Sequence, residues 1–273
     1  MRRFSADYLT ETRRGMWPPG ERAPLADLSL GDRERILDVG CGTGELSAVL
    51  AEEAPADARV VGLDRDPDLL AAVPDPVAAV RADARSLPVA DGAADLVVCQ
   101  ALLINLPDPE EVLAEFRRAS SDLVAAIEPD NGAVTVESTV DAEARLAARA
   151  RDRYVAGVGT DVTLGAVPDR FRAAGLRDVR TRRYDHERVV EPPYADSSVE
   201  SARRKASGRR LREQRETLLS GGMDEADYDD LRREWRAMGR TVAEQMAGGE
   251  YRRREVVPFH VTVGRVPPAG DGD

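Results

Sequence analysis

The residues best suited to chemistry lie in one short stretch near the start of the chain. Asp38 closes an apolar segment, and Gly40, Gly42 and Gly44 follow at alternate positions before a helix-forming segment that begins at Glu45. Glycine has no Cβ, so the backbone at these positions can approach a ligand closely. The first amides of the helix attract a negatively charged group such as a carboxylate. The pattern predicts a strand, turn and helix that hold a nucleoside-bearing small molecule.

Two further carboxylates belong to the same predicted site. Asp38, Asp64 and Asp83 lie at or near the ends of three successive predicted strands. In a parallel sheet, these carboxyl ends share one edge, where ligands bind. Asp64 is placed to accept hydrogen bonds from ribose hydroxyls, and Asp83 from an adenine amine, with the Ala84 amide nearby. Asp38 is placed to face a cationic part of the ligand.

Two ligand types compete for such an edge. A dinucleotide site requires a third glycine or an alanine at the position that Glu45 occupies. A glutamate there would repel a pyrophosphate. S-adenosylmethionine has no phosphate, and its ammonium and sulfonium groups tolerate nearby acids. The acid-rich edge therefore favours the sulfonium cofactor over a nicotinamide dinucleotide.

Strands and helices alternate along the first half of the chain, which predicts a mostly parallel sheet with helices on both faces. The best-signalled helix starts at Asp108 as N-cap and Pro109, followed by two glutamates, and turns Val112, Leu113 and Phe116 inward. The predicted strands cover residues 34–40, 59–64, 77–83, 94–100, 123–129, 179–184 and 256–266.

Several of these segments resemble the motifs of one enzyme family. Residues 36–46 resemble motif I of the class I S-adenosylmethionine-dependent methyltransferases, and residues 61–64 resemble their second-strand acid motif. Residues 83–88 and 95–100 are similar to their adenine-side segment and fourth strand. Residues 118–122 replace the Lys-Pro-Gly-Gly turn of many members, so a shorter turn is expected. The resemblance implies an α/β fold: a Rossmann-like, seven-stranded methyltransferase sheet with an antiparallel last strand.

The same resemblance implies the cofactor, S-adenosyl-L-methionine, and the residues that bind it. Asp38 and the glycine turn would contact the methionine part, Asp64 the ribose, and Gln100 would lie near the transferred methyl. The full set of cofactor-binding residues is Asp38, Gly40, Cys41, Gly42, Gly44, Asp64, Arg65, Asp83, Ala84 and Gln100.

The composition pattern suggests four parts. Residues 1–30 form an N-terminal arm or lid, residues 31–190 plus 256–267 the cofactor-binding core, and residues 191–255 a helical cap inserted before the last strand. Residues 268–273 are expected to be disordered. Within the cap, apolar residues step by three or four and predict a helix face that needs a partner; these are Tyr228, Leu231, Trp235, Met238, Val242 and Met246.

Two residues are candidates on the side of the methyl acceptor. Glu128 ends the fifth predicted strand beside the cofactor edge, and Asn131 follows it. Glu128 can orient a hydroxyl or amine or act as a base, and Asn131 can hydrogen-bond a polar substrate. A purely structural turn is the other interpretation, because residues 130–132 tolerate unusual backbone geometry. Both interpretations stay open here, and no other catalytic residue is identified.

The N-terminal arm combines aromatic and cationic groups. The groups that can close over cofactor or substrate and exclude water are Tyr8, Arg13, Arg14, Met16 and Trp17. Of these, Tyr8, Arg14 and Trp17 are substrate-side candidates. The alternative interpretation is that Met16 and Trp17 only dock the arm on the core.

Charge and cysteine content limit the function classes. The chain has 273 residues, 50 acids against 39 bases, a net charge of −11 and Lys205 as its one lysine. This acid excess disfavours nucleic acid as a partner and suits a halophilic source. The arginine clusters of the cap are interpreted as solvated and ion-paired, with RNA binding as the alternative. No metal-ligand spacing is present.

Location is inferred from what the sequence offers for export or anchoring. The two cysteines, Cys41 and Cys99, fall in predicted core elements, and neither a signal peptide nor a membrane span is visible. A cytoplasmic location is therefore expected, and the oligomeric state is left open.

The sequence thus predicts an S-adenosylmethionine-dependent methyltransferase that acts on a small-molecule acceptor by in-line displacement. The alternatives are an RNA-modifying methyltransferase, a non-catalytic S-adenosylmethionine-binding protein and a nicotinamide enzyme. The acceptor and the methylated atom are not identified by the sequence.

Overall fold

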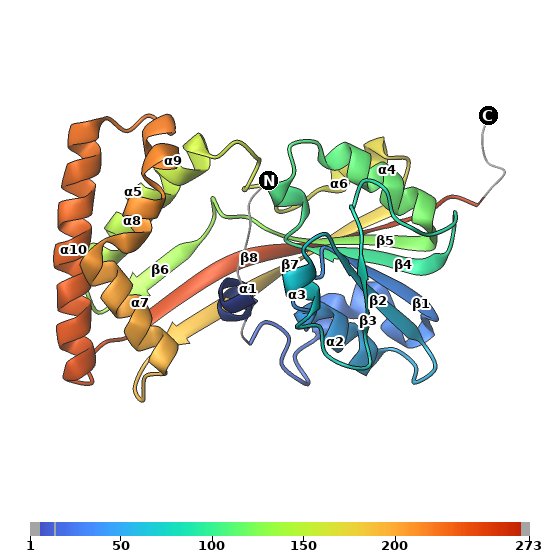
Figure 1. Cartoon of the computed structure of the whole chain (residues 1–273), viewed down its shortest axis with the longest axis horizontal. Coiled ribbons are helices and arrows are strands. Elements are labelled where there is room, and N and C mark those ends of the chain that lie inside the picture. The colour runs from blue at the N-terminus through green and yellow to red at the C-terminus, as the bar shows by residue number, and fades with distance from the viewer. Residues whose placement is uncertain (1–5, 14, 269–273) are drawn as a thin grey trace. The chain divides into compact units, whose positions relative to one another are not determined.

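The computed structural model describes residues 6–13 and 15–268 of the chain (Figure 1). The side chains of residues 7, 8, 10 and 11 are not described. Arg14 therefore lies outside the described residues, as do residues 269–273 of the predicted tail.

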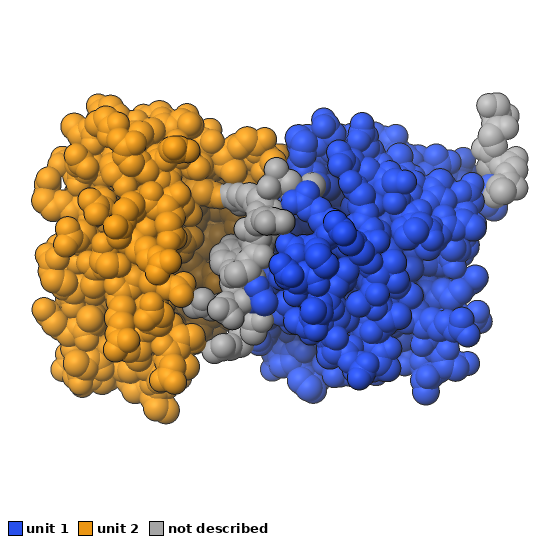
Figure 2. All heavy atoms as spheres, in the orientation of Figure 1, with its two compact units in different colours: residues 1–129, 164–184, 259–273 blue, residues 130–163, 185–258 orange. Residues whose placement is uncertain are grey.

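The chain divides into two compact units, coloured separately in Figure 2. The first comprises residues 1–129, 164–184 and 259–273, and the second comprises residues 130–163 and 185–258. The predicted cap falls within the second unit, which also takes in residues 130–163.

The first unit is built on a largely parallel sheet, as the sequence predicts. Its strands lie in the order β3-β2-β1-β4-β5, and β8 pairs antiparallel with β5, from Leu123 opposite Arg265 to Pro129 opposite Phe259. β7 pairs with β8 in turn. The strands are β1 (Arg35–Val39), β2 (Arg59–Asp64), β3 (Ala78–Arg81), β4 (Ala94–Gln100), β5 (Ser120–Pro129), β7 (Arg177–Val190) and β8 (Arg253–Arg265).

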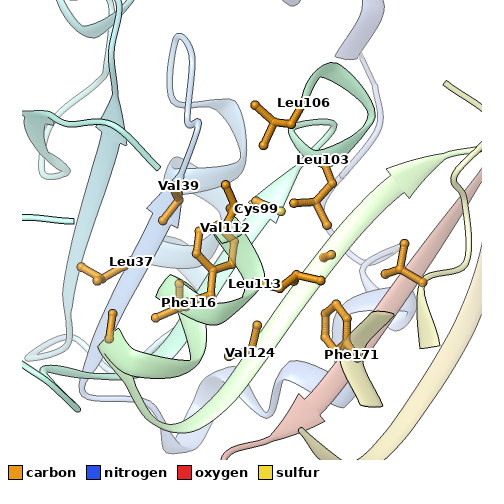
Figure 3. Packing of buried hydrophobic residues seen from close by; sticks show 14 of the residues in the cluster. Leu37, Val39, Cys99, Leu103, Leu106, Val112, Leu113, Phe116, Val124 and Phe171 are labelled. Carbon is orange, nitrogen blue, oxygen red and sulfur yellow. The ribbon is translucent and has the colours of Figure 1, made fainter. Parts of the chain in front are cut away.

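Helices cover both faces of this sheet (Figure 1). On one face, Leu37, Val39 and Cys99 belong to a buried cluster with Leu113 and Phe116 of α4 (Figure 3). Successive strand residues point to opposite faces, so Asp38 points away from that cluster. Its carboxylate meets Ser47 of α2, which places α2 on the other face. The helices are α2 (Glu45–Glu53), α3 (Pro67–Leu70), α4 (Pro109–Ala119), α6 (Pro168–Ala173), η1 (Ala23–Leu28), η2 (Leu30–Asp32) and η3 (Leu103–Asn105), preceded by α1 (Ala6–Arg13).

Helix α4 shows how local sequence sets its boundaries. Asp108 occupies the N-cap position and Pro109 opens the first turn, although the Asp108 side chain makes no capping hydrogen bond. Acids in the first turn and arginines in the last turn both complement the helix dipole. The helix ends at Ala119 and β5 begins at Ser120, so the connection is as short as predicted.

The second unit packs helices around the apolar face predicted for α10. Tyr228, Leu231, Trp235 and Met238 are all buried there, in a cluster that includes Leu146 of α5 and Ala202 of α7. Strand β6, which was not predicted, pairs antiparallel with the start of β8, with Ser138 opposite Arg253. The unit contains β6 (Thr135–Ser138), α5 (Asp141–Gly157), α7 (Asp196–Ser207), α8 (Arg209–Glu213), α9 (Arg215–Ser220) and α10 (Glu225–Ala247).

Three properties bear on function class. Both cysteines are buried and free. No helix in the described ranges has the length and apolar character that crossing a bilayer requires. Within those same ranges, no group of three or more His, Cys, Asp or Glu side chains can hold a metal ion.

Gly239 of α10 provides a test of the packing in the second unit. A Cβ there would lie 2.3 Å from the backbone nitrogen of Ala206 in α7. We expect Gly239→Ala to lower the free energy of unfolding by about 1–3 kcal/mol, because the helices must separate. Gly248→Ala is the matched control, since its Cβ would meet nothing closer than 3.7 Å. Urea unfolding of both variants measures the difference, and equal stabilities would contradict the packing.

Candidate functional site

The glycine turn leaves the carboxyl end of β1 and is anchored to β2. Gly40, Gly42 and Gly44 have positive φ values of 73°, 60° and 84°, a backbone region that side chains with a Cβ rarely adopt. The amides of Gly40 and Cys41 both donate to the Leu63 carbonyl, at 2.7 and 3.1 Å. The backbone thus stays hydrogen-bonded while it turns, and its geometry is set by the neighbouring strand.

Asp38 lies beneath this turn with half of its carboxylate unpaired. The residue is 1% exposed, and its Oδ2 accepts from Ser47 Oγ at 2.5 Å. Its Oδ1 is buried and has no hydrogen-bond partner among the described residues. Burial raises the pKa of Asp38 to about 6, although the Ser47 hydrogen bond opposes the rise. A cationic donor would therefore be strongly favoured next to this oxygen.

Asp64 links the end of β2 to the glycine turn. Its Oδ2 accepts from the Gly42 amide at 3.0 Å, and its Oδ1 accepts from the Asp66 amide at 2.9 Å. Each carboxylate oxygen has two lone pairs, so both oxygens retain capacity for a further donor. The structure brings Asp38, Asp64 and the glycine turn together as the sequence predicted.

Asp83 is a more exposed member of the same edge. The Arg85 guanidinium donates two hydrogen bonds to the Asp83 carboxylate: Nε lies 3.1 Å from Oδ1, and Nη2 lies 2.8 Å from Oδ2. These hydrogen bonds to Arg85 lower the pKa of Asp83 to about 2. Ala84 is half-buried, and Arg65 is exposed near enough to add its positive charge to the field at Asp83.

The segment after β4 carries further polar atoms without partners. Gln100 is 3% exposed; its Nε2 contacts Met16 Sδ at 2.8 Å, and its Oε1 has no hydrogen-bond partner among the described residues. Ala101 adopts a positive φ of 51°, which is strained for a residue with a Cβ. The Asn105 amide group donates to the Ala101 carbonyl at 2.8 Å, while its Oδ1 is likewise buried and unpaired in the described structure.

These atoms and the turn together fit a polar, partly cationic ligand. The first unit buries Asp38 Oδ1, Gln100 Oε1 and Asn105 Oδ1 without hydrogen-bond partners in the described structure. Each buried unsatisfied group costs about 1–3 kcal/mol, so such groups are expected where a ligand completes them. All three belong to the carboxyl ends of β1 and β4 or the segment that follows, the edge at which open α/β sheets bind ligands.

Glu128, the candidate base, is 0% exposed, and its carboxylate accepts hydrogen bonds from three backbone amides. Its Oε1 accepts from the amides of Leu102 and Leu103 at 3.1 and 2.8 Å, and its Oε2 from the Ile104 amide at 3.4 Å. Burial raises its pKa to about 7, against the effect of these amides. The carboxylate therefore holds the segment that follows β4 and orients the residues next to Gln100.

Asn131 belongs to the second unit. Its Nδ2 donates to the Val162 carbonyl at 2.7 Å, and its own amide donates to the same oxygen at 3.2 Å. Asp130 Oδ1 accepts from the Gly132 amide at 2.9 Å. These bonds are those of a structural turn, the second of the two interpretations left open by the sequence.

The N-terminal arm contributes Arg13, which the sequence indicated as one cationic group of the arm but not as an individual substrate-side or cofactor-binding candidate. Arg13 lies over the glycine turn, with Nη1 3.5 Å from the Cys41 carbonyl and 3.5 Å from Glu45 Oε2. Its Nη2 lies 3.4 Å from the Gln100 carbonyl. A Cβ added to Gly42 would meet Leu9 of α1 at 2.8 Å, so the arm and the glycine turn approach closely.

Trp17 docks on the core of the first unit. Its ring stacks on Tyr184 at a centroid distance of 5.1 Å and an interplanar angle of 21°, and Tyr184 Oη donates to the Met16 carbonyl at 2.7 Å. Of the other two arm candidates, Arg14 and the side chain of Tyr8 lie outside the described residues.

Sequence reasoning missed Ser47. A signal for Ser47 existed, because it is a polar residue beside Leu46 on the buried face of α2. Arg13 was expected only as one cationic group of an arm that can close over the site, and no local signal indicated its individual contacts with the glycine turn.

The comparisons with known proteins agree with this geometry. The model of the methyltransferase domain family matches residues 37–122, which span β1 to the start of β5. Residues 37–122 of this chain are therefore similar to a methyltransferase domain.

Curated relatives share this region of the chain. A trans-aconitate 2-methyltransferase from Escherichia coli O1:K1 / APEC is 40% identical over 113 residues, which are 39% of this chain and 44% of that protein. A demethylmenaquinone methyltransferase from Lactiplantibacillus plantarum is 35% identical over 103 residues, which are 34% of this chain and 44% of that protein. The chain thus spans less than half the length of these relatives.

Among solved structures, a putative methyltransferase from Bacillus halodurans C-125 is similar over a longer range. It is 14% identical, with a TM-score of 0.49, and the similarity covers 89% of this chain and 98% of that one.

The raised pKa of the buried Glu128 makes the free energy of unfolding depend on pH. Its pKa is raised from 4.5 to about 7 on folding, so the folded state holds the proton more tightly than the unfolded state. The stabilisation that the protonated Glu128 gives the folded state is fully present below pH 4.5 and is lost as the pH rises to about 7. We expect the stability difference between wild type and Glu128→Gln to fall across this window, by on the order of 3 kcal/mol at most. Urea unfolding at several pH values measures it, and a difference that does not change with pH would contradict the assignment.

Proposed function

We propose that this protein transfers a methyl group from S-adenosyl-L-methionine to a small-molecule acceptor by in-line displacement. The observation that carries the proposal is the set of unpaired buried oxygens beside a bare-backbone turn, in a chain whose residues 37–122 are similar to a methyltransferase domain. Those groups suit a ligand with an ammonium, a sulfonium and a nucleoside.

In this proposal each part of the edge holds one part of the cofactor. Asp38 and the backbone of the glycine turn, which a ligand can approach closely, hold the methionine part, and the Arg13 guanidinium is available for its carboxylate. Asp64 accepts from the ribose hydroxyls. Asp83 and the Ala84 amide bind the adenine, with Arg65 at the exposed rim, and Gln100 lies beside the reacting centre.

A nicotinamide dinucleotide suits the edge less well. Glu45 follows the turn directly, and both of its carboxylate oxygens lie 2.8 Å from Thr43 Oγ1. Its negative charge is thus held at the turn, where a pyrophosphate would have to lie. The same charge is compatible with a sulfonium compound.

The chemistry requires little of the protein beyond alignment. The bound cofactor supplies an activated methyl group, and the residues of the edge orient it and exclude water. A base is needed only for an acceptor that must lose a proton. Glu128 is buried and accepts from three backbone amides, so the proposal assigns it to positioning the segment after β4.

A small-molecule acceptor is supported by charge and by the relatives. The relatives named above are named for trans-aconitate and for demethylmenaquinone. Several arginines of the second unit pair with neighbouring acids, such as Arg209 with Glu213 at 2.8 Å. Together with a net charge of −11, this favours a solvated helical surface over an RNA-binding one.

The cofactor assignment is tested by binding alone. We expect Asp64→Asn to weaken binding of S-adenosylhomocysteine about tenfold or more, because one charged acceptor of the ribose hydroxyls is lost. Asp68→Ala, an exposed acid of α3, is the control and should bind as wild type does. Isothermal titration calorimetry measures both, and unchanged affinity in Asp64→Asn would remove Asp64 from the site.

The activity is tested by methyl transfer from tritiated S-adenosylmethionine into an extract of the source organism. Small-molecule, RNA and protein fractions are counted separately, with heat-inactivated protein as the control. We expect the label in the small-molecule fraction. Label only in RNA would replace the proposed acceptor class, and tight cofactor binding without any transfer would indicate a non-catalytic binder.

A further inference from the structure

The second unit contains a cluster of buried and partly buried charged side chains. Glu143 of α5 is 1% exposed and is the acceptor at its centre. It pairs with Lys205 of α7 and accepts from Tyr251 Oη at 2.8 Å. Arg253 Nε lies 3.3 Å from its other oxygen. Burial would raise the pKa of Glu143, but these partners lower it, so the carboxylate is charged.

A second carboxylate of the cluster is Glu255, whose side chain is 12% exposed. Arg253 Nη2 donates to its Oε1 at 2.9 Å, and Arg188 of β7 pairs with its Oε2. Burial alone would raise its pKa, yet the charges of Arg253 and Arg188 hold the pKa at about 2. Both acids of the cluster are therefore negative at neutral pH.

The cations of the cluster outnumber these acids. Arg151 of α5 donates to the Val134 carbonyl at 2.8 Å and forms no ion pair within the described part of the chain. Burial lowers its pKa, although Glu255 and Asp152 oppose the shift. Arg188 Nε is buried and has no hydrogen-bond partner in the described structure. Together with Asp152 and Arg210, which also act on this cluster, five cations face three acids, which leaves a surplus of two positive charges. The cations are Arg151, Arg188, Lys205, Arg210 and Arg253, and the acids are Glu143, Asp152 and Glu255.

This surplus does not follow from the overall composition. The chain has 50 acids against 39 bases, so acidic residues are plentiful. Partly buried cations without counter-charges are costly, and most such groups are paired. Guanidinium groups offer planar pairs of donors that match carboxylate and phosphate oxygens.

We propose that this cluster binds a small dianion, a dicarboxylate or a phosphate monoester, through Arg151 and Arg188. The anion would supply the two missing negative charges and the acceptors that Arg151 and Arg188 Nε lack. Glu143, Lys205 and Tyr251 hold the frame of the site, and Glu255 fixes the positions of the Arg188 and Arg253 guanidinium groups. The site lies within the second unit and does not depend on the proposed methyl transfer.

The test is a thermal-unfolding titration of the full chain with potassium phosphate and with potassium succinate. Potassium chloride at matched ionic strength corrects for general salt effects. We expect a saturable rise in the melting temperature with at least one of the two anions. Saturation by succinate alone identifies a dicarboxylate site, and saturation by phosphate alone identifies a phosphate site. A rise that never saturates, or none beyond that in chloride, would overturn the proposal.

Matched variants locate the anion. Arg151→Gln should weaken its binding at least tenfold, while Arg145→Gln on the same helix should not, because Arg145 is exposed and paired with Glu234 at 2.8 Å. Glu255→Gln raises the positive surplus to three and should strengthen binding. This opposite direction separates an anion site from a structural ion-pair network. Equal anion affinity in wild type, Arg151→Gln and Glu255→Gln would overturn the assignment.

Discussion

The hydrogen bonds between the glycine turn and the end of β2 are the constraint on which the candidate cofactor site depends. The chain must leave β1, reverse and start α2 within a few residues. The backbone adopts left-handed φ values at Gly40, Gly42 and Gly44. The Leu63 carbonyl and the Asp64 carboxylate accept hydrogen bonds from the backbone amides of this turn. Because Asp64 is used in this way, a residue that faces the ligand edge also sets the shape of the turn. α2 then begins where Ser47 can reach Asp38.

A second constraint lies after β4, where buried polar groups are held with little freedom. The Glu128 carboxylate accepts hydrogen bonds from three successive backbone amides. Ala101 adopts a strained backbone conformation with a positive φ, where the chain turns. Strain and desolvation of this kind persist only where the surrounding structure enforces them, and they gather at functional sites. The unpaired oxygens of Asp38, Gln100 and Asn105 belong to the same edge. The first unit thus places three unpaired buried oxygens where a polar ligand can offset their cost, whereas Asp95 Oδ1 and Trp17 Nε1 are unpaired elsewhere in the described part of this unit.

The two units use charge differently. On the exposed helices of the second unit, arginines pair with acids on the same or a neighbouring turn, and such pairs contribute about 0–1 kcal/mol each. Inside that unit, the same residue types converge from α5, α7, β7 and β8 and retain an excess of positive charge. Lys205, the one lysine of the chain, lies in this cluster. A compact ammonium suits the approach to Glu143 and Tyr251, where a guanidinium fork would need more room.

Local sequence patterns determined much of the first unit. The bounds of β2 and β4 match the prediction, and the glycine turn, the start of α4 and the buried face of α10 all lie where periodicity and capping residues placed them. These features depend on side chains close together in the chain, so the information is local. The edge formed by Asp38, Asp64 and Asp83 was predictable too, because a parallel sheet aligns successive strand ends.

The tertiary structure alone decided the remaining features. β6 is four residues long and forms by pairing with β8, more than a hundred residues away. Glu128 ends a strand beside the ligand edge, as a base could, yet its carboxylate accepts from the amides of the neighbouring segment 102–104. Arg13, Arg151 and Arg188 look like ordinary surface arginines in the sequence. Their roles follow from which groups meet them in space, and that depends on long-range packing and burial, which a local pattern does not encode.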